Sequence, residues 1–111
     1  MDIEGLLAAY TDACNRFDMD AIEQMFVEDA VYASPGLAHE MRGRTAIMSA
    51  FRAYFKEHNE QVSEDHDVKV TAPRIIENRW SLRSLGKERH GWQRIEFNPS
   101  GKITRIDVND N

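Results

Sequence analysis

The sequence has one cysteine, three prolines and no long apolar run. A single cysteine, Cys14, cannot form an internal disulfide, which fits a reducing cytoplasm. No stretch approaches the roughly 20 apolar residues of a membrane-spanning helix. The chain starts with acidic residues, Met1-Asp2-Ile3-Glu4, where a secretory signal would be basic. We therefore expect a soluble cytoplasmic protein without a membrane partner.

Several short catalytic motifs are also missing. The chain has no Gly-x-Ser-x-Gly turn for a serine nucleophile, no glycine-rich phosphate loop and no His-Glu-x-x-His zinc motif. His39 and Glu40 are followed by Gly43 at the place of the second zinc-binding histidine. We therefore expect no bound metal and no other cofactor.

Positive charge is scarce overall but concentrated locally. The chain has 14 Lys and Arg against 19 Asp and Glu, and a net charge of −5 repels nucleic-acid phosphates. The basic residues gather in segment 74–94, together with Trp80 and Trp92. Aromatic and basic residues together are typical of single-strand binders, but both tryptophans suit a core or a pocket wall better. We expect no nucleic-acid partner.

What the sequence does contain is a set of helical patterns near its start. Apolar residues recur at helical spacing over residues 3–17, and again over 47–58 in a helix that begins at Gly43. Between them, Asp20 and Glu23 predict a capping box for a short helix that buries Ile22, Met25 and Phe26. A strand should follow over 31–34.

After Asn59 the hydrophobic period changes to two, which is typical of strands. Alternation predicts strands over 67–71, 79–83, 90–97 and 103–108, with a turn at 98–101 before the last. Helices followed by antiparallel strands indicate an α+β fold. The length of 111 residues predicts one domain, residues 1–111. Its curved sheet, covered by helices, can leave a pocket.

Three stretches resemble a known family: LLAAYTDACNRFDMDAIEQMFVEDAVYASPG, GRTAIMSAF and FNPSGKITRI. They resemble the nuclear-transport-factor-2-like superfamily, especially its SnoaL-like and ketosteroid-isomerase-like branches. The resemblance implies a cone-shaped, strongly curved antiparallel sheet with three N-terminal helices on its concave face, enclosing a pocket. It also implies a homodimer formed through the sheet. Members include isomerases, dehydratases, cyclases, epoxide hydrolases and plain binding proteins.

The resemblance to ketosteroid isomerases can be followed residue by residue. Those enzymes use a carboxylate base before a proline and an oxyanion hole made by a tyrosine and a protonated aspartic acid. Tyr10 falls at the tyrosine, Ser34 before Pro35 falls at the base, and Gln93 falls at the second donor. A serine without a neighbouring base cannot take a proton from carbon at pH 7, so we do not expect standard ketosteroid isomerisation.

An epoxide-hydrolase arrangement fails in a similar way. It would need Arg-x-Asp on a middle strand, and the sequence has Arg79-Trp80-Ser81. Asp107 is one residue out of phase on the last strand, so it should face the other side of the sheet. Arg79 itself faces either the outer surface, if Trp80 faces the helices, or the pocket.

Candidate site residues remain, each with a plain structural alternative. For catalysis these are Tyr10, which could equally be core, and two candidate bases, His39 and His66. The alternative for His66 is a surface position, and the alternation favours it because it puts Asp65 and Asp67 on the opposite face. Predicted substrate contacts, otherwise ordinary strand and core residues, are Tyr32, Ser34, Phe51, Trp80 and Gln93.

Two functional classes follow. One is an enzyme of isomerase, dehydratase or cyclase type that acts on a small, partly hydrophobic molecule. The other is a non-catalytic ligand-binding or assembly domain of the same fold. The missing carboxylate before Pro35 favours the second class, whereas a pocket-facing His39 or His66 would favour the first.

Overall fold

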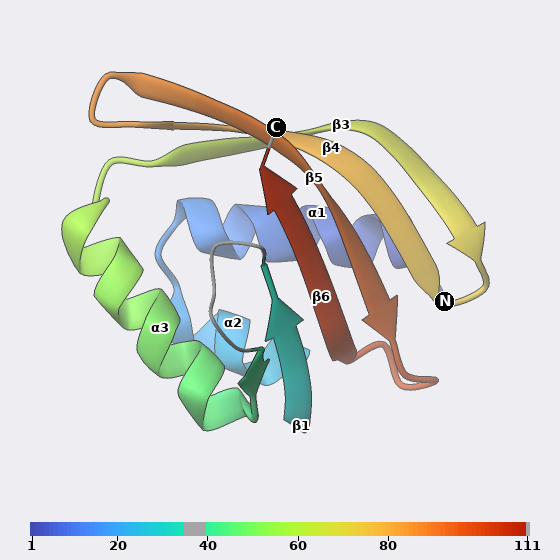
Figure 1. Cartoon of the computed structure of the whole chain (residues 1–111). Coiled ribbons are helices and arrows are strands. Elements are labelled where there is room, and N and C mark those ends of the chain that lie inside the picture. Colours follow the sequence, from blue (N-terminus) through green and yellow to red (C-terminus); the bar gives the residue numbers. More distant parts are fainter. Residues whose placement is uncertain (35–39, 111) are drawn as a thin grey trace.

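The computed structural model describes residues 1–34 and 40–110, in which three helices cover one face of a six-stranded sheet (Figure 1). The helices are α1 (Ile3–Asn15), α2 (Met19–Met25) and α3 (Arg44–Glu57). As the sequence predicts, α3 begins directly after Gly43, which has φ 94°. No helix in this part of the chain is long and apolar enough to span a membrane.

The start of α2 differs from the predicted capping box. The side chain of Asp18 accepts a 3.1 Å hydrogen bond from the backbone N–H of Ala21 and so caps the helix. The box of Asp20 and Glu23 is wrong, because Asp20 already lies in the first helical turn. Phe26 is buried as expected, but its backbone is extended and it begins the first strand.

The sheet has the strand order β2-β1-β6-β5-β4-β3, with strands β1 (Phe26–Ala33), β2 (Met41–Arg42), β3 (Val62–Ala72), β4 (Ile75–Ser84), β5 (Lys87–Phe97) and β6 (Ile103–Asp110). Strands β3 to β6 pair antiparallel in chain order, and β2 pairs antiparallel with β1. β1 runs parallel to β6, because the intervening helix and hairpins return the chain to its side. The predicted α+β fold is confirmed, with this pair making the sheet mixed.

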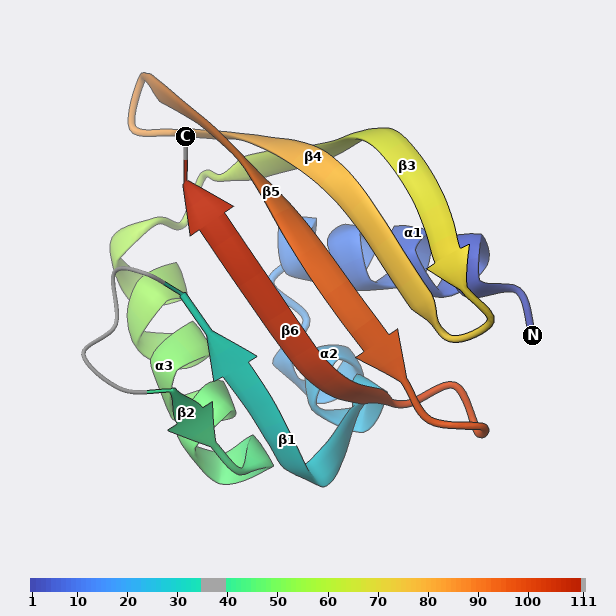
Figure 2. The same cartoon turned by 45° about the vertical axis from the view of Figure 1, so that its right-hand side comes forward.

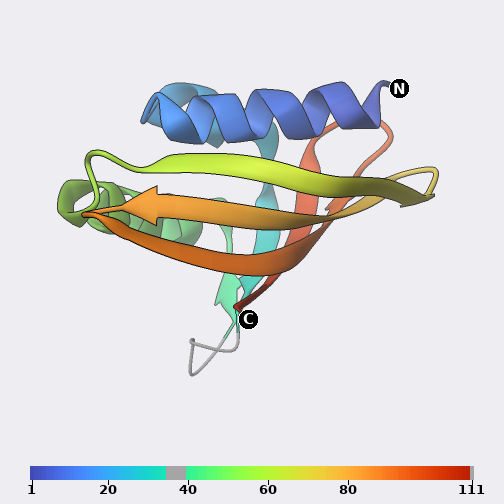
Figure 3. The same ribbon diagram turned by 90° about the horizontal axis from the view of Figure 1, so that it is seen from above.

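The sheet curves strongly, and its concave face lies against the helices (Figures 2 and 3). Alternation along β4 turns Trp80 toward the helices, where it is 8% exposed. The side chain of Arg79 points to the outer face and is 65% exposed. This decides between the two orientations that the sequence left open for Arg79.

The core occupies one end of this concave space. Its largest fully buried side chains come from α2, α3 and the strand ends near the β5–β6 turn: Ile22, Phe26, Ile47, Met48, Ile76, Ile95, Ile103 and Ile106. Further along the same strands, the inward positions change to Asn78 on β4, and to Gln93 and then Gly91 on β5. The packed core therefore gives way to an open, partly polar space.

Candidate functional site

A cavity of about 300 Å³ lies between α1, α3 and the concave face of the sheet. This is near the lower end of the range of roughly 300–1,000 Å³ for small-molecule sites. Six residues singled out in the sequence meet in its wall: Tyr10, Tyr32, Ser34, Phe51, Trp80 and Gln93. The wall is completed mainly by apolar and aromatic side chains, including Met41, Tyr54, Phe55, Leu82 and Val108.

A carboxylate in the inner part of this wall comes from Asp65 of β3, which the sequence does not single out as a site residue. Its Oδ2 accepts a 2.6 Å hydrogen bond from the hydroxyl of Thr11. Its Oδ1 accepts a 3.1 Å bond from the side-chain amide of Asn78. Burial raises the pKa of Asp65 above its usual value, and the two hydrogen bonds oppose that shift. A partly buried acid of this kind can give or take a proton.

A chain of buried amides continues from Asp65 across the sheet. Asn78 on β4 is 4% exposed, and its side-chain oxygen accepts a 3.1 Å hydrogen bond from Nε2 of Gln93 on β5. The side-chain nitrogen of Asn78 also donates a 2.8 Å bond to the carbonyl of Arg79, which can only accept, and this fixes the orientation of the Asn78 amide and, through it, that of Gln93. Three neighbouring strands thus present an ordered polar row at the cavity.

Tyr10 combines the two roles that the sequence left open. Its ring is 8% exposed and packs edge-on against Phe26, with the centroids 6.1 Å apart, so it belongs to the core. The same residue lines the cavity. Burial, and then the neighbouring Cys14, raise the pKa of Tyr10 well above its usual value, so its hydroxyl remains protonated. A neutral hydroxyl here can donate a hydrogen bond to a ligand oxygen.

Cys14 is buried, as the sequence predicts. Burial raises the pKa of its thiol to about 12. The thiolate is the reactive form of cysteine, and it is therefore rare at neutral pH. Cys14 contributes to the wall of the cavity without serving as a nucleophile.

His66 does not share the cavity with Tyr10. It is exposed on the outer face of β3, where its Nε2 lies 2.9 Å from the hydroxyl of Ser81. The strand alternation that turns Asp65 inward turns His66 outward, so a base role for His66 in this cavity is wrong. The side chain of Asp67 also points outward, and its Oδ2 lies 3.7 Å from Nε of Arg79. The alternation is broken there because the register of β3 shifts between His66 and Lys69, where Asp67 has φ 51°.

The two histidines that flank α3 in the sequence are His39 and His58. His39 lies outside the described residues. His58 ends α3, where its ring stacks on Tyr54 at 4.3 Å and its Nδ1 lies 2.9 Å from the hydroxyl of Ser84. Within residues 1–34 and 40–110, no cluster of three His, Cys, Asp or Glu side chains could hold a metal ion.

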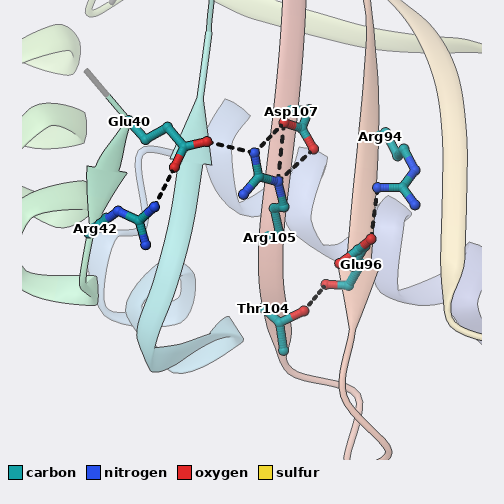
Figure 4. Close-up of polar contacts among 7 residues, drawn as sticks. All are labelled: Glu40, Arg42, Arg94, Glu96, Thr104, Arg105 and Asp107. Carbon is teal, nitrogen blue, oxygen red and sulfur yellow. Dashed lines mark hydrogen bonds and ion pairs between the residues drawn. The ribbon is translucent and has the colours of Figure 1, made fainter.

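Asp107 faces the outer surface of β6, in agreement with its predicted phase (Figure 4). Nε of Arg105 donates to both of its carboxylate oxygens, at 3.2 and 3.0 Å, and Nη2 donates to Glu40 at 2.8 Å. The hydrogen bond from Arg105 lowers the pKa of Glu40. Asp107 is therefore held in an outer ion-pair network and cannot reach a ligand in the cavity.

An ion pair also lies at the rim of the cavity, separate from the outer network of Arg105. Nη2 of Arg89 lies 2.5 Å from Oδ2 of Asp110, and both residues line the cavity. The guanidinium also lies over the Trp80 ring, 6.0 Å from its centroid. This ring packs closely on Gly91, since a Cβ at Gly91 would collide with Trp80 and with the carbonyl of Asn109. The sequence analysis missed Arg89, although strand alternation places it on the same face as Gln93.

The family model for the SnoaL-like domain matches residues 7–106. None of the curated protein sequences matches the chain.

Solved structures share the fold at low sequence identity. One is the epoxide hydrolase/cyclase-like enzyme SalBIII of pyran ring formation in the polyether salinomycin, with a TM-score of 0.86 and 20% identity over 98% of this chain and 90% of that one. A proposed ketosteroid isomerase from Kribbella flavida has a TM-score of 0.86 and 16% identity over 98% and 77%. A proposed polyketide cyclase from Sinorhizobium meliloti has a TM-score of 0.80 and 23% identity over 94% and 93%. These similarities establish the nuclear-transport-factor-2-like, ketosteroid-isomerase-like fold.

Proposed function

The chain belongs to the SnoaL-like domain family, and we propose that its cavity binds a small, partly hydrophobic molecule and catalyses a proton transfer on it. The observation that carries this proposal is Asp65, a carboxyl group with a raised pKa in the wall of an otherwise largely apolar cavity. Such an environment is typical of acids and bases in active sites. The reaction class would be isomerase, dehydratase or cyclase chemistry.

In this proposal Asp65 transfers the proton and the neighbouring polar groups hold the substrate. The Thr11 and Asn78 hydrogen bonds fix the carboxylate, which keeps it in one orientation. Tyr10 and Gln93 supply hydrogen-bond donors for a carbonyl or hydroxyl oxygen of the substrate. The carboxylate thus comes from β3, and it replaces the one that is missing before Pro35.

Two observations support the chemistry. The cavity offers aromatic walls for an apolar body together with few polar groups, the usual composition of a small-molecule site. The similar solved structures are named as a cyclase-like enzyme, a proposed isomerase and a proposed cyclase. Their low identity leaves the substrate of this chain to be found by experiment.

The second candidate function is ligand binding without turnover. It is favoured by the hydrogen bonds of Asp65, because each carboxylate oxygen already accepts one from the protein. A carboxylate held by one bond on each oxygen can serve to order α1, β3 and β4 without taking part in a reaction. The two candidates differ in one measurable property, which is whether a bound ligand is converted.

A thermal-shift screen against steroids, phenols, short acyl acids and terpenoid epoxides tests the binding proposal. A ligand present at 100 times its Kd stabilises the fold by ~2.7 kcal/mol, and this raises Tm by roughly 10 °C. Ala50→Trp should abolish the shift by filling the cavity, whereas Ala46→Trp, on an exposed position of the same helix, should not. A panel that shifts neither the wild type nor Ala46→Trp would contradict the proposal.

We also propose that two copies pair through the outer face of the sheet. Trp92 is 39% exposed on β5, and its outward side chain offers apolar area for such a contact. Light scattering at low micromolar concentration tests this. A dimer has twice the 12.8 kDa of one chain, and a clean species at the single-chain mass would contradict it.

A further inference from the structure

Arg89 is the only cationic side chain that lines the cavity in the described part of the chain. It occupies the rim, where it is half exposed, while the inner wall contains Asp65 and aromatic rings. Its position is fixed on two sides: Asp110 pairs with Nη2, and the guanidinium lies over the Trp80 ring. A cation held in this way at the entrance of an apolar cavity is preorganised for a ligand.

Asp110 leaves most of the guanidinium available. Arginine has five N–H donors, and among the described residues the only acceptor within hydrogen-bond reach of Arg89 is Oδ2 of Asp110. The remaining donors include a pair of parallel N–H groups that matches the two oxygens of a carboxylate. The guanidinium is held in place at the same time by its position over the Trp80 ring, 6.0 Å from the ring centroid.

We propose that Arg89 binds a carboxylate group of the ligand, so that the ligand is a small monocarboxylic acid with an apolar body. The inference rests on the proposed function, whose substrate class it narrows. A cavity wall with one cation and two aspartates, Asp65 and Asp110, suits a single negative charge and disfavours a phosphate dianion. The apolar body then lies against Phe51, Phe55 and Leu82.

The strand register sets the spacing between the two ends of such a ligand. Arg89 pairs with Leu82, and Asp65 pairs with Trp80. The two charged residues are therefore two strands apart across the sheet and two residues apart along the strand direction. Their backbones are therefore separated by ~12 Å, given ~4.8 Å between strands and ~3.3 Å per residue. The site reacting at Asp65 thus lies several bonds from the carboxylate. This favours medium-length acyl or aryl-alkyl acids over very short ones.

Matched acids and amides test the inference, since an acid and its primary amide have almost the same shape but differ in charge. The probes are hexanoate and hexanamide, benzoate and benzamide, and 4-phenylbutanoate and 4-phenylbutanamide, measured by calorimetry at pH 7.5. The wild type should bind the best acid at least tenfold more tightly than its amide. Arg89→Met keeps a long unbranched apolar side chain at this position but removes the charge, and it should reduce this ratio to about one. Arg89→Lys should retain part of it.

Two further variants complete the experiment. Asp110→Asn removes the competing carboxylate and should increase the affinity for the acid relative to its amide. Arg79→Gln changes an outer-face cation of similar exposure and should leave the ratio as in the wild type. Equal binding of acid and amide to the wild type, or an unchanged ratio in Arg89→Met, would overturn the inference while leaving ligand binding itself established. If the wild type binds none of the probes and none of the ligands of the wider screen, the proposed function is overturned as well.

Discussion

The hydroxyl of Thr11 on α1 donates a 2.6 Å hydrogen bond to Oδ2 of Asp65 on β3, across 54 residues of sequence. This bond joins the first helix to an edge strand of the sheet. It also fixes the direction of the carboxylate that the cavity presents to a ligand. The chemistry that we propose depends on this contact, and so do the first two predictions.

Replacing Asp65 with asparagine should change how stability depends on pH. Burial raises the pKa of Asp65 in the folded state above its unfolded value of 3.8. Stability from this group is therefore full below pH 3.8 and is lost as the pH rises through the folded pKa. Asp65→Asn has no such loss, so the variant should gain stability relative to the wild type between pH 3.5 and 7. Urea unfolding across this range measures the free energy of unfolding of both proteins. A gain of the variant over the wild type that becomes smaller as the pH rises would contradict the assignment.

Thr11→Val should alter the titration of Asp65 without changing the shape of the site much. The hydroxyl stabilises the charged carboxylate, so its loss should raise the pKa of Asp65 further. In the pH–rate profile of a converted ligand, the limb that reports Asp65 should move to higher pH. Thr11→Ser retains the hydroxyl and should restore the wild-type profile. A purely structural role for Thr11 would lower the rate without moving the limb.

Tyr10→Phe separates packing from ligand contact. The ring of Phe keeps the edge-on contact with Phe26, so Tm should stay within a few degrees of the wild type. Loss of the hydroxyl should weaken ligand binding about five- to tenfold, as expected for one hydrogen bond. Calorimetry and thermal unfolding of the same preparation measure both effects. An equal loss of stability and affinity would make Tyr10 a core residue only.

Gly91→Ala should destabilise the fold, because the added Cβ would collide with the Trp80 ring and the Asn109 carbonyl. Overpacking of this kind costs ~1–3 kcal/mol, or roughly 5–15 °C in Tm. Val70→Ala serves as the control, since Val70 is exposed and its truncation should cost less than about 0.5 kcal/mol. A Gly91→Ala variant as stable as the control would show that the sheet relaxes around the Trp80 ring.

Much of this arrangement can be predicted from the sequence, because the spacing of apolar residues indicates which segments are helices and which are strands. Helical spacing around Ile47 predicts the buried face of α3, and strand alternation around Trp80 predicts which side chains share a face, although not which of the two faces is inward. The resemblance adds the curvature that gathers Tyr10, Tyr32 and Gln93 into one cavity. Phe26 was assigned to a helix because its burial fits either pattern, and only pairing with β6 makes it a strand residue.

The acid and the cation of the site were missed for a different reason. Asp65 precedes His66, and the histidine was selected as the candidate base although alternation allows only one of the two to face the cavity. The choice depends on which face of β3 the helices cover, and this is a tertiary property. The register shift at Asp67 breaks the alternation and has no clear signal in the residues themselves. Arg89 lies in a run of charged residues that is typical of a solvated hairpin.

The turnover of Asp65→Asn on the ligand that gives the largest thermal shift is the most direct test of the account. General acid–base catalysis by one side chain contributes roughly 10²–10⁴-fold to a rate. We expect kcat to fall at least 100-fold, while Kd stays within about threefold because the amide retains the shape of the carboxylate. A variant that converts the ligand as fast as the wild type would contradict the central role of Asp65.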